Sequence, residues 1–155
     1  MVVRGVDGTQ SPSTVSHQSK WQVEPKYPMS DRNRIFIVVG ALILFLATVL
    51  GAYGTHGIEG VVSAQRWNAY QVAVDYQFYH GLGVITAAIL SDRFPQSQWI
   101  RVSGWLLLIG IIVFAGSIYA TTFGAPDEIG SLAPFGGLSM MAGWLSLALG
   151  ALRAK

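Results

Sequence analysis

Apolar residues gather in four runs along the chain, and short polar or charged segments separate these runs. Each run approaches the ~20 residues that cross a ~30 Å hydrocarbon core as an α-helix. Because a backbone in lipid must satisfy its hydrogen bonds internally, helices are the expected structure. The pattern predicts an all-α, four-helix transmembrane bundle with spans at about residues 35–53, 69–90, 102–122 and 135–152.

The first 33 residues differ from the rest of the chain, since they are polar and show no helical or strand period. Such a segment is expected to be disordered alone and to become ordered only on a partner. Trp21, Tyr27 and Met29 are the side chains best suited to anchor it there. We therefore divide the chain into an extramembrane arm, residues 1–33, and a four-span membrane domain, residues 34–155.

The composition indicates a membrane protein and excludes some kinds of partner and metal site. Hydrophobic residues make up 52% of the chain, charged residues only 12%, and the mean hydropathy is +0.45, whereas soluble domains carry about a quarter charged residues. The net charge of +2 comes from basic residues scattered between the apolar runs, so we expect the bilayer and other membrane subunits as partners, and no nucleic acid. The absence of cysteine from the sequence excludes disulfides and thiolate metal sites.

The distribution of basic residues predicts the orientation. All but Arg66 of the ten Lys and Arg residues lie before the first span, between the second and third spans, or at the C-terminal end, which a four-span topology places on one side. The other two loops carry Glu59, Asp127 and Glu128. The positive-inside rule then places both termini in the cytoplasm.

The second apolar run is unusual because it contains a cluster of polar groups: Asp75, Tyr76, Gln77, Tyr79 and His80. At about 100° per residue, Asn68 and Gln71 share one helix face with Asp75 and Tyr79. Polar groups in hydrocarbon normally face a bundle interior, a cavity or a partner. We therefore expect Tyr76, Tyr79 and His80 to face inward. Leu82, Ile85 and Ile89 are expected to face lipid or a partner.

Several functions fit this intramembrane polar cluster. The plainest is a buried hydrogen-bond network in which His80 pairs with a tyrosine, and Asp75 pairs with a hydroxyl, with Arg66 or with a loop backbone. A proton or water path is the second, since imidazole titrates near neutral pH. Ligand or lipid binding is a third. Haem ligation is a fourth, although His56 is expected at the outer interface and His80 near the midplane.

A glycine-rich segment follows the first span, and Gly54, His56 and Gly57 within it form a second candidate site. A tight turn folded onto the mouth of the bundle is the simpler interpretation, and a ligand site that includes His56 is the alternative. The sequence shows no phosphate-binding loop, metal-ligand spacing or nucleophile motif. We therefore expect no catalytic residues, no metal, no cofactor and no enzymatic activity.

Four ordered motifs resemble the domain-of-unknown-function 423 family, small four-span membrane proteins of bacteria with mitochondrial relatives of the transmembrane protein 256 type. The segment from Gly51 to Gly57 resembles the family's GAFGAHG signature. The segments 73–80, 114–119 and 133–144 are similar to AVxYQxxHAL, FSGSLY and TPxGG…GW. Tyr76, Gln77 and His80 match their motif directly, whereas Asp75 occupies a variable motif position.

The resemblance covers residues 36–152 and implies a fold, a membrane and a topology, but no activity. It favours the bacterial inner membrane over the mitochondrial inner membrane. The expected function is that of a structural or accessory subunit of a larger inner-membrane complex. The alternative is a proton or small-solute conduit along the polar face of the second span.

Overall fold

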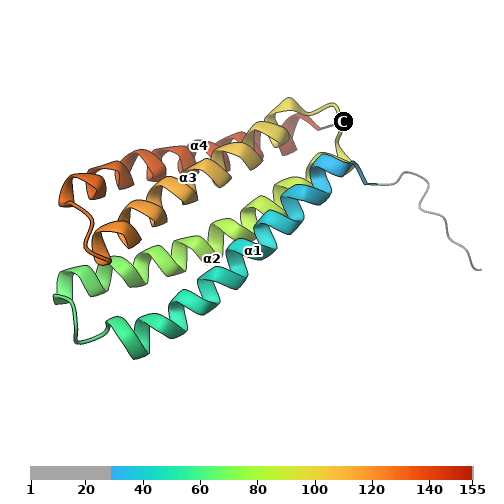
Figure 1. Ribbon diagram of the computed structural model, residues 1–155. Helices are drawn as coiled ribbons and strands as arrows, with labels where there is room; N and C mark the ends of the chain where they lie inside the picture. The colour runs from blue at the N-terminus through green and yellow to red at the C-terminus, as the bar shows by residue number, and fades with distance from the viewer. Residues whose placement is uncertain (1–28, 155) are drawn as a thin grey trace, which may run out of the picture.

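The computed structural model describes residues 29–154, which form four long helices joined by short connections (Figure 1). Helix α1 is followed by a π-helical turn, η2, and a 3-10 turn, η3, precedes α4. The elements are α1 (Asp31–Tyr53), η2 (Gly54–Ile58), α2 (Ala64–Arg93), α3 (Gln98–Thr122), η3 (Asp127–Leu132) and α4 (Ala133–Arg153). Residues 29–154 contain no β-strand. The predicted all-α class is confirmed, and each predicted span lies within one helix.

Serine side chains cap the starts of three of the helices. Ser30 accepts a hydrogen bond from the backbone N–H of Asn33 at 3.3 Å, and Ser63 accepts one from Arg66 at 3.4 Å. Ser97 does the same for α3. Each cap satisfies a backbone donor that a helix start leaves unpaired. Helix α4 instead has Pro134 in its first turn, where the missing proline N–H costs nothing.

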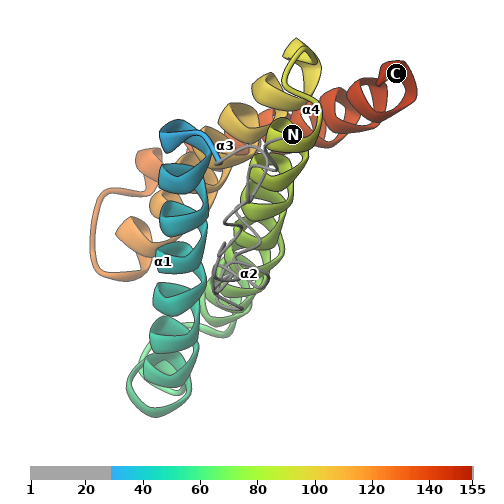
Figure 2. The same ribbon diagram turned by 90° about the vertical axis from the view of Figure 1, so that its right-hand side faces the viewer.

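Helices that follow one another in sequence pack against one another, so α2 lies against α1 and α3, and α3 lies against α4. Figure 2 shows α1 and α2 side by side, with the C-terminal end of α4 diverging from them. Helices α3 and α4 approach each other closely where Gly136 of α4 meets α3. A Cβ at Gly136 would lie 2.5 Å from the backbone nitrogen of Phe114, so only glycine allows this packing distance.

Three segments of residues 29–154 are long and apolar enough to cross a membrane: Asp31–Ile58, Gln98–Thr122 and Asp127–Arg153. Helix α2 has the length but is more polar. It nevertheless links the far end of α1 to the start of α3, and the start of α3 lies beside the start of α1 (Figure 1). If α1 and α3 cross in the same direction, α2 must return the chain through the membrane between them.

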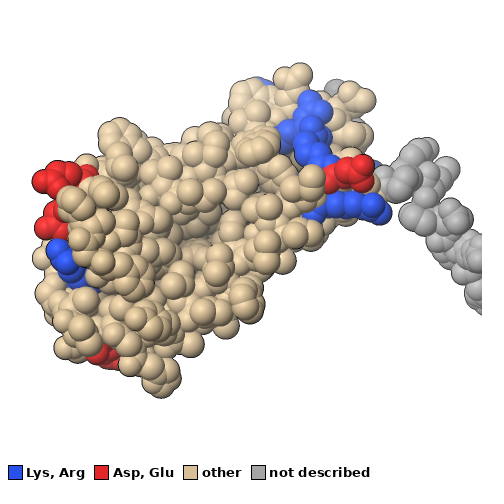
Figure 3. Space-filling model, in the orientation of Figure 1, with Lys and Arg blue, Asp and Glu red and all other residues tan. Residues whose placement is uncertain are grey.

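Charged side chains gather at the two ends of the helices and leave the middle uncharged on the face that Figure 3 shows. Arginines surround the end where α1 starts and α4 finishes, whereas acidic residues dominate the opposite end. We call these the basic end and the acidic end. This separation suits a protein whose middle lies in hydrocarbon.

Candidate functional site

Gln77 joins three helices near the middle of α2. Its side-chain amide donates to the backbone carbonyl of Ile43 in α1 at 2.9 Å, and its carbonyl accepts from the hydroxyl of Tyr119 in α3 at 2.7 Å. The side chain is only 7% exposed. A buried amide with both ends paired costs little and holds its neighbours in register. Of the predicted network residues, Gln77 thus makes side-chain hydrogen bonds between helices, and its α3 partner is Tyr119.

His80 lies one turn further along α2 and is also buried, with 7% exposure. Its Nδ1 donates to the backbone carbonyl of Tyr76 at 2.7 Å, since a carbonyl can only accept. The ring lies between the ring of Tyr76, 5.5 Å away, and that of Trp144 in α4, 6.0 Å away. The expectation that His80 faces inward is confirmed, but its hydrogen bond goes to the backbone of its own helix and not to a tyrosine hydroxyl.

Tyr79 and the polar residues that share its helix face do not point inward, and this part of the expectation is wrong. Tyr79 is 58% exposed, and Asp75 is exposed beside it on the same helix face. Asn68 and Gln71, which share that face, are exposed as well. Tyr76 occupies an intermediate position, because its ring stacks on Phe114 at 5.1 Å while part of it stays exposed.

Small side chains help to explain which face of α2 packs against the neighbouring helices. The buried face of α2 carries Ala73, Gly81 and Ala88. A Cβ at Gly81 would lie 3.0 Å from Leu44, so α1 approaches α2 closely at that point. The larger side chains on this buried face, Tyr70, Gln77 and His80, each have a hydrogen-bond partner within the protein. The inward face of α2 therefore combines small residues with polar groups that are paired.

Two of the three apolar side chains of α2 that were expected to face lipid or a partner are exposed. Leu82 and Ile89 are exposed, as expected of residues that face lipid or a partner. Ile85 is not, since it is partly buried against Gly40 of α1. The exposed surface of α2 is thus polar toward the acidic end and apolar toward the basic end.

The glycine-rich segment after α1 forms the π-helical turn η2 and then the predicted tight turn, in which the N–H of Val61 donates to the carbonyl of Ile58 at 3.0 Å and Gly60 has a φ of +79°. The φ of Gly54 is −54°, so a positive φ does not explain this glycine. Instead, a Cβ at Gly54 would lie 2.5 Å from the ring of Tyr70, whose hydroxyl donates to the carbonyl of Leu50 at 2.6 Å. Gly54 therefore admits the Tyr70 ring, which our sequence analysis did not single out. A close-contact glycine in a signature segment is the signal that could have suggested an aromatic neighbour.

The other residues of this candidate site lie apart from Tyr70. His56 is exposed at the acidic end, and Gly57 lies against the ring of Tyr53. No group of three or more His, Asp and Glu side chains within residues 29–154 is arranged to hold a metal ion.

A shallow hollow of about 200 Å³ lies between the outer parts of α1 and α2. Thr55 and Asp75 contribute polar groups to it, and Tyr70 contributes an aromatic wall. The remaining lining residues are Gly51, Trp67, Gln71 and Val74. The hollow joins the glycine-rich segment to the exposed polar face of α2, so these two candidate sites form one continuous surface.

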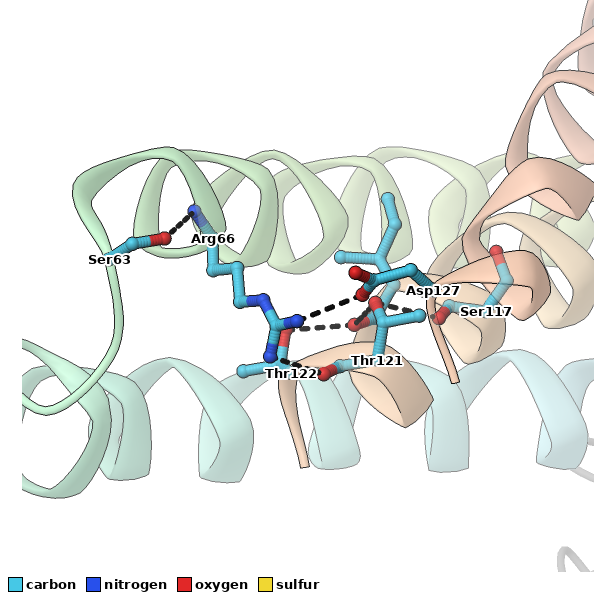
Figure 4. Close-up of polar contacts among 7 residues, drawn as sticks. Ser63, Arg66, Ser117, Thr121, Thr122 and Asp127 are labelled. Atoms are coloured by element: carbon cyan, nitrogen blue, oxygen red, sulfur yellow. Dashed lines mark hydrogen bonds and ion pairs between the residues drawn. The ribbon is translucent and has the colours of Figure 1, made fainter. Parts of the chain in front are cut away.

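Arg66 connects α2 to the connection between α3 and α4 at the acidic end (Figure 4). Its guanidinium donates to Asp127 at 2.8 Å and to the backbone carbonyl of Thr121 at 3.2 Å. This excludes the option that Asp75 pairs with Arg66 in this structure. The single basic residue expected at the outer side is thus paired with an acidic residue of the other outer loop.

The anchor residues predicted for the N-terminal arm are only partly described. Trp21 and Tyr27 lie outside residues 29–154, and so does the rest of the arm up to residue 28. Met29 directly precedes the capping residue of α1 and is partly buried. The first residues of α1 come from the last positions that the sequence analysis assigned to the arm.

Four packed helices, three of them apolar enough to span a membrane, define this chain as a multi-pass membrane protein. Comparison with family models makes the assignment more specific. The model described as "Protein of unknown function (DUF423)" matches residues 50–137. The chain belongs to this family, which confirms the resemblance seen in its motifs.

The chain is also similar to curated proteins described as UPF0382 membrane proteins. A UPF0382 membrane protein of Staphylococcus haemolyticus is 39% identical over 74% of this chain and 92% of its own length. The UPF0382 membrane protein YwdK of Bacillus subtilis is 32% identical over 77% of this chain and 98% of its own length. A UPF0382 membrane protein of Haemophilus influenzae is 32% identical, with 77% and 95% covered. No solved structure gives a significant match to the chain.

Proposed function

We propose that this protein is a non-catalytic accessory subunit that binds another membrane protein through the polar stripe of α2. We define this stripe as Asn68, Gln71, Asp75 and Tyr79. The observation that carries the proposal is the exposure of Asp75 and Tyr79 on a helix that must return the chain through the membrane. A surface of this kind is suited to a partner and poorly suited to acyl chains.

The position of Asp75 along α2 determines how much free energy its carboxylate costs in the bilayer. A rise of about 1.5 Å per residue puts Asp75 about 16 Å along α2 from Ala64. The helix has 30 residues and is about 45 Å long, so a hydrocarbon core of about 30 Å centred on it would place Asp75 about 9 Å below the boundary at the acidic end. An ionised carboxylate at the bilayer centre costs about 3 kcal/mol, and less toward the interface. A partner helix with hydroxyl or amide donors would offset that cost.

The buried polar groups argue for a packing role and against a conduit. Gln77 and Tyr119 bond to each other and so hold two helices together, whereas His80 bonds to the backbone of its own helix. Within residues 29–154, no buried side-chain nitrogen or oxygen is without a hydrogen-bond partner. A proton path would instead need groups free to exchange partners, or ordered water.

The proposed location is the bacterial inner membrane, with both termini in the cytoplasm. The relatives are membrane proteins of bacteria, and the basic end of the structure carries both described ends of the chain. The arm before residue 29 would then lie on the cytoplasmic side, where we propose that it also contacts the partner.

Native gel electrophoresis of membranes solubilised in mild detergent tests the proposal. We expect the full-length protein to migrate in a larger assembly, and Asp75→Leu to shift it toward its free mobility. Leu145→Ala is the matched control, since Leu145 is exposed on α4, away from the stripe. Deletion of residues 1–28 keeps the Ser30 cap and tests the arm separately. Migration of the wild type at its free mobility would contradict the proposal.

A further inference from the structure

The basic end contains a hollow of about 470 Å³ that the proposed function does not use. It lies between the connection from α2 to α3 and the last residues of α4. Arg93 and Arg153 are its charged lining residues, and Trp99 contributes an aromatic ring. The rest of the lining consists of Phe94, Pro95, Gln96, Ser97, Gln98 and Ala154. None of these described lining residues is acidic.

The guanidinium groups of Arg93 and Arg153 each lie over an aromatic ring. The Arg153 guanidinium carbon lies 5.1 Å from the centre of the Trp99 ring, and that of Arg93 lies 5.5 Å from the centre of the Phe94 ring. Stacking of this kind restrains a long side chain while its N–H donors stay available. An arginine that is already restrained loses less entropy when it binds an anion.

The nearby charges leave these two arginines available. Within residues 29–154, the ion pairs are Arg34 with Asp31 and Arg66 with Asp127, so neither Arg93 nor Arg153 pairs with a described carboxylate. The adjacent Asp92 is engaged elsewhere, because it accepts from the backbone of Ser30 and from Asn33 at the start of α1. The hollow therefore has a net positive charge that no described acidic residue offsets.

The positive charge of the hollow suits an anionic ligand, and its position at the end of the helices indicates that this ligand is a lipid headgroup. It lies where the apolar helices end, and Trp99, an interfacial type of residue, is 43% exposed there. We propose that this hollow binds the phosphate of an anionic phospholipid, with Arg93 and Arg153 donating hydrogen bonds to the phosphate oxygens. Basic pockets at the membrane interface bind anionic headgroups through the same chemistry.

Native mass spectrometry of the full-length protein, with phosphatidylglycerol and phosphatidylcholine of identical acyl chains as probes, tests this site. We expect wild type to bind phosphatidylglycerol preferentially. Arg93→Gln combined with Arg153→Gln should lose about fivefold in affinity for each arginine. Replacing both arginines by lysine should restore part of the affinity, because the charge returns without the planar fork.

Arg34→Gln is the matched control, since it removes one positive charge at the same end but outside the hollow. It should bind phosphatidylglycerol as wild type does. Equal binding of the two lipids by wild type, or an equal loss in Arg34→Gln and the double variant, would overturn the proposal. Millimolar inorganic phosphate is the competitor. Displacement of the lipid by phosphate would assign the hollow to a soluble phosphate and overturn the lipid source.

Discussion

The hydroxyl of Tyr119 in α3 donates to the side-chain carbonyl of Gln77 in α2 across 2.7 Å. Because the amide of Gln77 also bonds to the backbone of Ile43, one side chain ties α1, α2 and α3 together. Serine hydroxyls make comparable bonds from α4 to α3, since Ser139 donates to Leu106 and Ser146 donates to Trp99, both at 2.8 Å. Side-chain hydrogen bonds thus join every pair of consecutive helices.

Replacing Gln77 should weaken the first three helices together. Gln77→Leu removes both bonds and leaves the Tyr119 hydroxyl without its partner, so we expect the free energy of unfolding to fall by about 1–2 kcal/mol. Reversible unfolding in mixed micelles measures this loss. Tyr119→Phe removes one of the two bonds and should cost less. A double variant no less stable than Gln77→Leu would show that the pair is coupled; full additivity would contradict the structure.

Enlarging Gly54 should disturb the packing of Tyr70. The Cβ that Gly54→Ala adds would lie 2.5 Å from that ring, so we expect a loss of about 1–3 kcal/mol in the free energy of unfolding. The matched control is Gly116→Ala, a helical position with no heavy atom within 4 Å of the added Cβ. It should be neutral or stabilising by up to about 1 kcal/mol. Equal effects in both variants would show that the Tyr70 contact does not set the cost.

The charge distribution predicts the orientation of the protein in its membrane. The chain has no cysteine, so single cysteines can be labelled without background. A membrane-impermeant thiol reagent added to intact spheroplasts should label Glu59→Cys and Glu128→Cys, which lie at the acidic end. Lys20→Cys and Ser97→Cys should react only after lysis. Labelling in the reverse order would refute cytoplasmic termini.

Proteoliposomes with an entrapped pH-sensitive dye test the conduit alternative. Because Gln77, Tyr119 and His80 are engaged in fixed hydrogen bonds, we expect the wild type to pass protons no faster than protein-free vesicles do. Gramicidin provides the positive control. A flux that His80→Phe and Asp75→Asn both abolish would establish a conduit and argue against a purely structural role.

The order and number of the helices could be predicted from the sequence alone, whereas α1, α2 and α3 begin four or five residues before the predicted spans. An apolar run of about 20 residues leaves its backbone few alternatives to a helix in lipid. The capping serines Ser30, Ser63 and Ser97 mark three helix starts, and Pro134 marks the fourth. The inward position of His80 also followed from its sequence neighbourhood, since a buried site is the cheapest place for an imidazole within a membrane.

Which face of α2 turns inward was decided only by the tertiary structure. Polarity alone favoured an inward Asp75 and Tyr79, but helix packing depends on side-chain volume at the contact, and the residues that fit against α1 and α3 are small ones such as Ala73 and Gly81. The contact between Gly54 and Tyr70 also joins residues from different helices. Periodicity describes one helix at a time, whereas such choices depend on how two surfaces fit together.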